Sequence, residues 1–93
     1  MQHDWEKIAN WAADLYEART TQLALTGKLD ITYVHPAYRV TTHEVMARFG
    51  LNLAPWMAEF QAAFQKEMRK RKLHLVLKGK MKSEEWYNKY RKG

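Results

Sequence analysis

The sequence contains no cysteine, and this absence excludes a disulfide scaffold, a thiol nucleophile and a zinc ribbon. It also contains no apolar run of about 18 residues, so no transmembrane helix is expected. Residues 1–11 carry acids early and contain no apolar core segment, which argues against a secretory signal. We therefore expect a cytoplasmic protein.

The residue patterns that catalysis requires are also missing. The four glycines are scattered, so the sequence has no glycine-rich phosphate loop. Ser83 is the only serine, and its position before two glutamates is typical of a helix N-cap and not of a nucleophile. The histidines, at positions 3, 35, 43 and 74, lack the spacing of metal ligands. The sequence predicts no enzyme, no bound metal and no cofactor.

The net charge of +6 is divided unevenly along the 93 residues, a length that suits one domain. Residues 1–65 hold five cations and seven acids, a net charge of −2. Residues 66–93 hold eleven cations and three acids, a net charge of +8. We therefore expect a single domain, 1–93, in which a near-neutral helical body, 1–65, precedes a strongly basic C-terminal third, 66–93. Such a distribution favours a polyanionic partner.

The hydrophobic periodicity predicts a mainly α-helical fold, a compact bundle of about four helices at 4–26, 42–49, 53–72 and 83–91. In the first helix, Asp4 is the expected N-cap and Gly27 the expected C′ residue. Thr41 and Glu44 have the spacing of a capping box, which predicts the start of the second helix. Gly50 is expected to end that helix.

The two later helices also have start signals. Asn52 is a candidate cap for the third helix, and Pro55 falls within its first turn, where the missing N–H costs nothing. Ser83 is the expected cap of the last helix, with acids following it.

Two short segments alternate apolar and polar residues and predict a small two-stranded β element, 29–34 paired with 73–78. Leu29, Ile31 and Tyr33 alternate with polar neighbours, and Pro36 disfavours a helix that continues through it. Leu73 to Leu77 follow a similar alternation, although more helix is an alternative for this second segment.

Residues 42–60 resemble a helix-turn-helix, and the order of elements is similar to that of a winged helix. Phe49, Gly50 and Leu51 would form the turn. A recognition helix presents polar side chains to base edges, whereas Asn52 is the only base-reading side chain among the corresponding exposed positions here. A helical hairpin that packs for stability is therefore the favoured interpretation.

The candidate binding residues are the cations of the basic third together with its aromatic side chains. Cations neutralise phosphates, and aromatic side chains among cations are typical of single-strand stacking platforms. For the tract 66–72 a solvated helix end is the alternative, and for the aromatic residues packing on the core is the alternative. The candidates are Lys66, Arg69, Lys70, Arg71, Lys72, Lys78, Lys80, Lys82, Trp86, Tyr87, Lys89, Tyr90, Arg91 and Lys92.

Two functions fit these features. The favoured one is a small, non-catalytic nucleic-acid-binding protein that contacts phosphates without reading the sequence. The alternative is a protein-binding inhibitor or adaptor, similar in size and composition to small phage-encoded accessory proteins, that docks on an acidic or nucleic-acid-binding protein. A homodimer through the long apolar helix at 53–72 is a third alternative. The cations of that helix cluster at one end, which argues against a membrane-surface helix.

Overall fold

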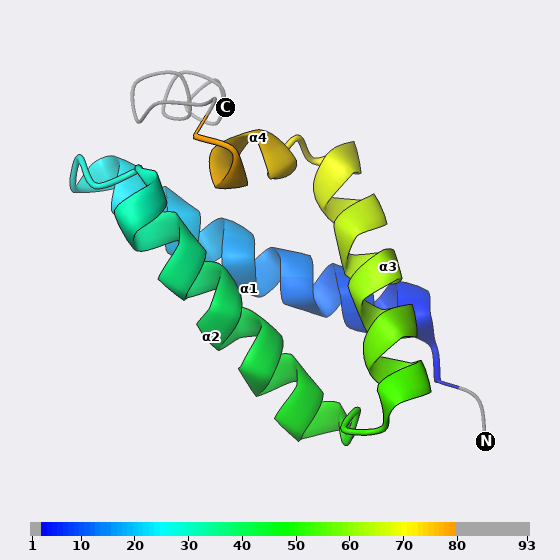
Figure 1. The fold of residues 1–93 in the computed structure, drawn as a ribbon. Coiled ribbons are helices and arrows are strands. Elements are labelled where there is room, and N and C mark those ends of the chain that lie inside the picture. Colours follow the sequence, from blue (N-terminus) through cyan, green and yellow to red (C-terminus); the bar gives the residue numbers. More distant parts are fainter. Residues whose placement is uncertain (1–2, 80–93) are drawn as a thin grey trace.

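The computed structural model describes residues 3–79, which form four α-helices and no strand within this range. The helices are α1 (Trp5–Leu25), α2 (Ile31–Phe49), α3 (Ala54–Lys70) and the single turn α4 (His74–Leu77) (Figure 1). The prediction of a mainly helical bundle is confirmed. The helix predicted at 83–91 lies outside the described residues.

Helix α1 begins and ends at the predicted residues. The Asp4 carboxylate accepts a hydrogen bond from the Lys7 backbone N–H at 3.1 Å, which satisfies one of the free donors of the first turn. Gly27 follows the C-cap with a φ of 71°, a left-handed conformation that glycine adopts without steric cost. The prediction for 4–26 is confirmed.

The prediction of a strand at 29–34 and a separate helix at 42–49 is wrong, because α2 runs without interruption from Ile31 to Phe49. Asp30 caps this helix by accepting a hydrogen bond from the Thr32 N–H at 2.8 Å. Buried positions then recur at helical spacing through Val34 and Val45. Pro36 lies inside the helix, so its effect on local preference is overridden by the packing of this face.

Thr41 and Glu44 do not form a capping box, since both lie in the interior of α2. The Thr41 hydroxyl donates to the Ala37 carbonyl at 2.7 Å, four residues earlier. Glu44 pairs with Arg19 of α1 at 2.6 Å. Both side chains therefore support the helix and its contact with α1.

Helix α3 follows the predicted range 53–72 closely. Pro55 lies in its first turn as expected, but the N-cap is Leu53, which makes no side-chain cap hydrogen bond, and not Asn52. The side chains of Phe60, Phe64 and Met68 are buried. A homodimer through this apolar face would have to expose it.

The prediction of a strand at 73–78 is also wrong, because residues 74–77 form α4. Leu73 and Val76 are both buried, a spacing of three that suits a helical turn and not an alternating strand. The helices that contain the two predicted segments are nevertheless neighbours: His35 Nε2 of α2 lies 2.7 Å from the Leu77 carbonyl oxygen of α4. A side chain, and not a ladder of backbone bonds, joins them.

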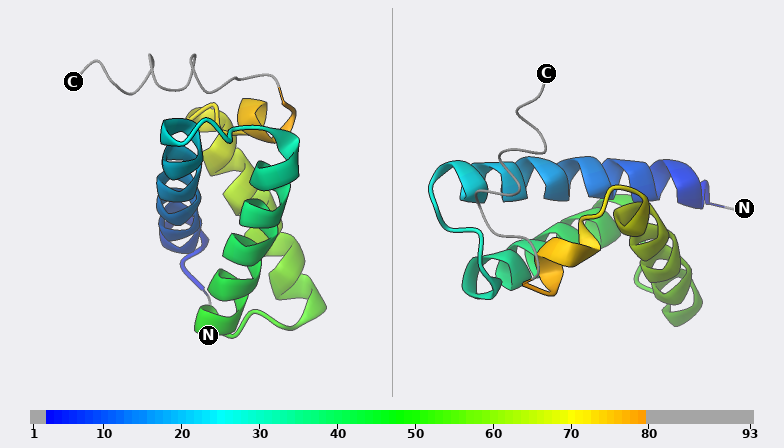
Figure 2. Two further views of the ribbon diagram at one scale, coloured as in Figure 1. Left: turned by 90° about the vertical axis from the view of Figure 1, so that its left-hand side faces the viewer. Right: turned by 90° about the horizontal axis from the view of Figure 1, so that it is seen from above.

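Helix α1 is the element on which α2 and α3 assemble, and α4 packs against α2 and α3. Seen from above, α2, α3 and α4 lie on the same side of α1 (Figure 2). Buried side chains from all four helices form one core cluster. Tyr16 of α1 meets Tyr38 of α2 edge to face at 5.7 Å, and Tyr38 stacks on Phe64 of α3 at 5.3 Å. Tyr38 of α2 therefore lies between a ring of α1 and a ring of α3.

Candidate nucleic-acid interface

Six of the predicted binding residues lie in the described part of the chain, at the C-terminal end of α3 and beside α4. Five of them have exposed side chains, and the sixth, Arg71, is half-buried. The five exposed cations, which we call the basic face, are Lys66, Arg69, Lys70, Lys72 and Lys78. The remaining candidates lie outside the described residues; they are Lys80, Lys82, Trp86, Tyr87, Lys89, Tyr90, Arg91 and Lys92.

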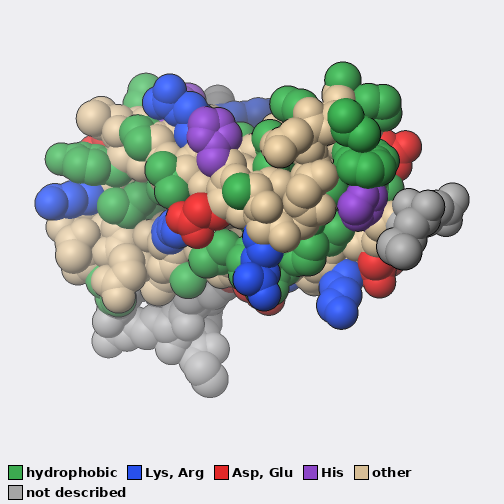
Figure 3. Space-filling model, turned by 90° about the horizontal axis from the view of Figure 1, so that it is seen from below, with side chains coloured by type: hydrophobic (Ala, Val, Ile, Leu, Met, Phe, Trp, Pro, Cys, Tyr) green, Lys and Arg blue, Asp and Glu red, His purple; other side chains and the backbone are tan. Residues whose placement is uncertain are grey.

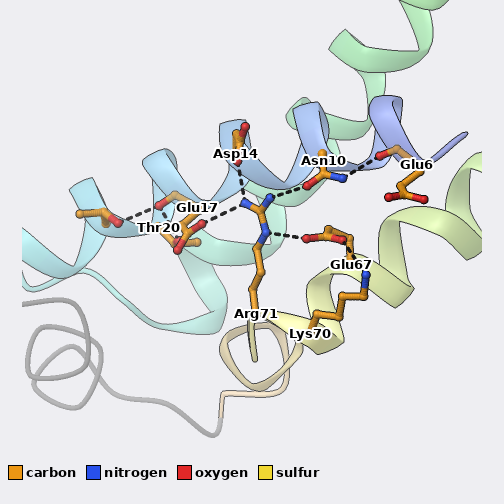
Figure 4. Close-up of polar contacts among 9 residues, drawn as sticks. Glu6, Asn10, Asp14, Glu17, Thr20, Glu67, Lys70 and Arg71 are labelled. Atoms are coloured by element: carbon orange, nitrogen blue, oxygen red, sulfur yellow. Dashed lines mark hydrogen bonds and ion pairs between the residues drawn. The ribbon is translucent and has the colours of Figure 1, made fainter. Parts of the chain in front are cut away.

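Arg71 points inward and joins α3 to α1 (Figure 4). Its Nη1 lies 2.7 Å from Asp14 Oδ1 and 3.0 Å from Glu17 Oε1, and its Nε lies 2.9 Å from Glu67 Oε2. Its Nη2 donates to the Asn10 side-chain oxygen at 3.1 Å. The guanidinium is therefore occupied by groups of the protein itself, which removes Arg71 from the phosphate-contacting set that the sequence predicts.

The balance of forces on Arg71 keeps it charged. Burial alone would lower its pKa, but hydrogen bonds to Asp14 and Glu67 and the nearby charge of Glu17 raise the pKa above its usual value. The same carboxylates are neutralised by Arg71. Because Arg71 offsets part of their negative charge, these carboxylates weaken the positive field of the basic face less than three unpaired carboxylates would.

Lys72 has an unusual backbone. Its φ is 62°, and it is the only non-glycine residue with a positive φ among residues 3–79. The Leu73 N–H bonds the Met68 carbonyl at 2.8 Å and the Lys72 N–H bonds the Arg69 carbonyl at 3.2 Å, the pattern of a Schellman motif. Helices α1 and α2 end with a glycine in the left-handed conformation, Gly27 and Gly50, whereas α3 ends with a lysine in that conformation.

Helix α2 also contributes to this region, which the sequence patterns do not predict. Two adjoining hollows of about 350 and 300 Å³ lie between α2, α3 and α4, and they share Gln65 and Leu77 as walls. We call the two together the basic hollow. The charged, histidine and amide side chains that line it are His35, Arg39, Gln65, Arg69, His74 and Lys78. The four-residue spacing of His35 and Arg39 would have placed both on one helix face, but only once 31–41 was read as helix.

The opposite end of the molecule has a different character. Seen from below, where α2 ends and α3 begins, lysines and arginines are interspersed with acids and with hydrophobic side chains (Figure 3). The first residues of α3 and its cap expose Leu53 and Met57, which offer no hydrogen bonds to base edges. The helix-turn-helix resemblance of 42–60 therefore remains without base-reading side chains beyond Asn52.

An apolar groove of about 470 Å³ lies between α1 and α2. Pro36, the residue expected to prevent a helix, forms part of its wall. Tyr33 and Ile31 are exposed on the same helix, at 42% and 55%. The apolar lining of the groove comprises Leu15, Ala18, Leu23, Tyr33, Pro36 and Ala37.

No three His, Asp or Glu side chains among residues 3–79 gather as a metal site would require. None of the helices in the described range is both long and apolar enough to cross a membrane.

Comparison of the chain with protein families, curated proteins and solved structures finds no match.

Proposed function

We propose that this protein is a small, non-catalytic nucleic-acid-binding protein that contacts the phosphate backbone through its basic face. The observation that carries the proposal is the exposure of five cations around the end of α3 and α4. Four of them, Lys66, Arg69, Lys72 and Lys78, make no ion pair within residues 3–79. Lys70 has one weak pair, 3.7 Å from Glu67. These side chains are available to phosphates.

The contact would not depend on base sequence. Lysine and arginine bonds to phosphate oxygens hold a protein on nucleic acid but carry no sequence information. The exposed side chains at the start of α3 add no donors for base edges. The residues after 79 add five further cations and the aromatic side chains of Trp86, Tyr87 and Tyr90, which supports single-stranded nucleic acid as a ligand alongside duplex.

Fluorescence anisotropy with labelled single-stranded and duplex oligonucleotides of unrelated sequence tests the proposal. We expect log K to fall linearly with log salt between about 50 and about 200 mM, with a slope near −0.9 for each phosphate neutralised on duplex and near −0.7 on single strands. Affinities for unrelated sequences should agree. Absence of binding at the lowest salt, or an affinity independent of salt, would overturn the proposal.

A protein-binding inhibitor or adaptor is the second candidate, and the apolar groove between α1 and α2 favours it. Exposed apolar surface with charged surroundings is typical of protein interfaces. The matching test is capture of a stoichiometric partner from nuclease-treated lysate. Ala18→Glu, which places a charge on the groove wall, should abolish capture, whereas Ala47→Glu, at an exposed position of α2 outside the groove, should not. Capture that neither variant changes would count against the groove.

A further inference from the structure

The basic hollow is a concave site built by three helices that are distant in sequence. His35 and Arg39 come from α2, Gln65 and Arg69 from α3, and Lys78 follows α4. Its two parts have volumes of about 350 and 300 Å³, at the lower end of the range of small-ligand sites. The hollow therefore has the size for a small ligand or for one group of a larger one.

All formal charges that line the hollow are positive. Arg39, Arg69 and Lys78 contribute three cations, and no carboxylate lines either part. None of the three makes an ion pair within the described range, so their mutual repulsion is not offset locally. The nearest acid on α3, Glu67, is held by Arg71 on the side that faces α1. An anion in the hollow would meet a positive field from several directions.

Two histidines also line the hollow, one in each part. His35 donates from Nε2 to the Leu77 carbonyl at 2.7 Å, which fixes the wall between α2 and α4. Nδ1 of His74, by contrast, is buried and has no hydrogen-bond partner. His35 lines one part of the hollow and His74 the other, so each side chain reports on a ligand that enters its part.

We propose that the basic hollow binds a phosphate group, with Arg39, Arg69 and Lys78 as its charged donors. Guanidinium groups suit phosphate because their parallel N–H bonds match two of its oxygens. The choice of phosphate over other anions rests on the proposed function. The phosphate can belong to a nucleic-acid strand or to a small phosphorylated molecule, and the chemistry of the site is the same in both cases.

The test follows the side-chain resonances of the four histidines by NMR while inorganic phosphate is added at constant ionic strength. His35 and His74 should shift saturably, whereas His3 and His43, which do not line the hollow, should not. Arg69→Gln should weaken the phosphate affinity about tenfold, because it removes a charge-assisted bond. Arg48→Gln, which removes an equal charge from the end of α2, should leave the affinity unchanged. Absence of a shift, or equal shifts of all four histidines without saturation, would overturn the site.

A second titration uses an oligonucleotide with and without a 5′-phosphate. Its result shows whether the bound phosphate belongs to a nucleic-acid strand or to a small phosphorylated molecule. Shifts of His35 and His74 with either oligonucleotide show that a strand reaches the hollow. Shifts with inorganic phosphate alone assign the site to a small phosphorylated molecule. In that case the phosphate site stands even if anisotropy detects no nucleic-acid binding, so the two proposals fail separately.

Discussion

Arg71 and Lys72 are neighbours in the sequence with opposite surroundings. The Arg71 side chain is only 18% exposed and is bonded to three carboxylates, whereas Lys72 is exposed. The sequence pattern predicts the same role for both residues, because a run of cations does not reveal which side chain turns inward. The difference arises from acids on α1, Asp14 and Glu17, which lie more than 50 positions earlier.

Replacement of Arg71 by Gln should destabilise the fold by about 2 kcal/mol, less than the loss from a fully buried pair. Glu17 would remain half-buried without a cation, and Glu67 would keep only its weak pair with Lys70. Urea unfolding measures this change. Lys70→Gln is the control: its side chain is 62% exposed, and the loss should be at most about 0.5 kcal/mol. Equal effects of the two variants would contradict the structural role of Arg71.

Replacement of Lys72 by Gly should stabilise the protein by about 0.5–1 kcal/mol, because glycine adopts the left-handed conformation without the strain of a side chain. Nucleic-acid affinity should fall in the same variant. Lys66→Gly, in the interior of α3, should instead destabilise by about 1 kcal/mol. Thermal unfolding compares the two, and a loss of stability in Lys72→Gly would refute the assigned backbone strain.

The buried hydroxyl of Tyr16 should make the stability of the protein depend on pH in the alkaline range. Burial, and then the nearby Tyr38, raise the pKa of its hydroxyl above the ordinary value of 10.0. The folded state therefore keeps a proton that the unfolded chain loses, and the free energy of unfolding should fall as pH rises above about 10, by up to about 1.4 kcal/mol per pH unit from this residue.

Tyr16→Phe should make this alkaline decline shallower. At neutral pH it should cost about 1 kcal/mol, because the hydroxyl donates to the Val34 carbonyl at 3.2 Å. Urea unfolding at a series of pH values measures both effects, with Tyr33→Phe as a control for loss of an exposed hydroxyl. An unchanged pH slope in Tyr16→Phe would be inconsistent with this linkage.

At the scale of the element, α2 is the helix that sequence patterns misassign. Gly27, Gly50 and Pro55 are local signals with one dominant conformational reading, so the ends of α1 and α2 and the start of α3 could be predicted. Pro36 and the alternation around Ile31 are local signals too, but the burial of Val34 against Tyr16 outweighs them. Only contacts between helices reveal that outcome.

The same reasoning applies to the candidate site. The exposed cations of α3 could be predicted from composition. Arg39 could not, because its place in the basic hollow depends on how α2 packs against α1 and α4.

Pro36→Ala should stabilise the protein by about 2 kcal/mol. Alanine supplies a backbone N–H that can bond the Thr32 carbonyl, and it removes the proline ring that crowds this carbonyl. The unfolded chain of the variant has greater conformational freedom, which offsets part of the gain. Urea unfolding measures it. Ala47→Pro, in the same helix, should lower stability by about 3 kcal/mol. A less stable Pro36→Ala variant would mean that the proline is needed for the shape of α2.

For the whole molecule, the distribution of charge is the feature with functional consequences. The acids nearest the end of α3 are held by Arg71, while the basic face has cations without such partners. At the end where α2 meets α3, charges of both signs are mixed (Figure 3). A polyanion should therefore approach by one face, and not by general attraction to a positively charged protein.

The most direct test compares the salt dependence of nucleic-acid binding in two double variants with equal loss of charge. Lys66→Gln/Lys72→Gln alters the basic face, whereas Lys7→Gln/Arg48→Gln alters the beginning of α1 and the end of α2, away from α4 (Figure 1). The proposed interface predicts that the first pair flattens the duplex slope by about 1.8, close to 0.9 for each lost contact, and that the second leaves it unchanged. Equal slopes for the two variants would contradict a localised phosphate-binding face.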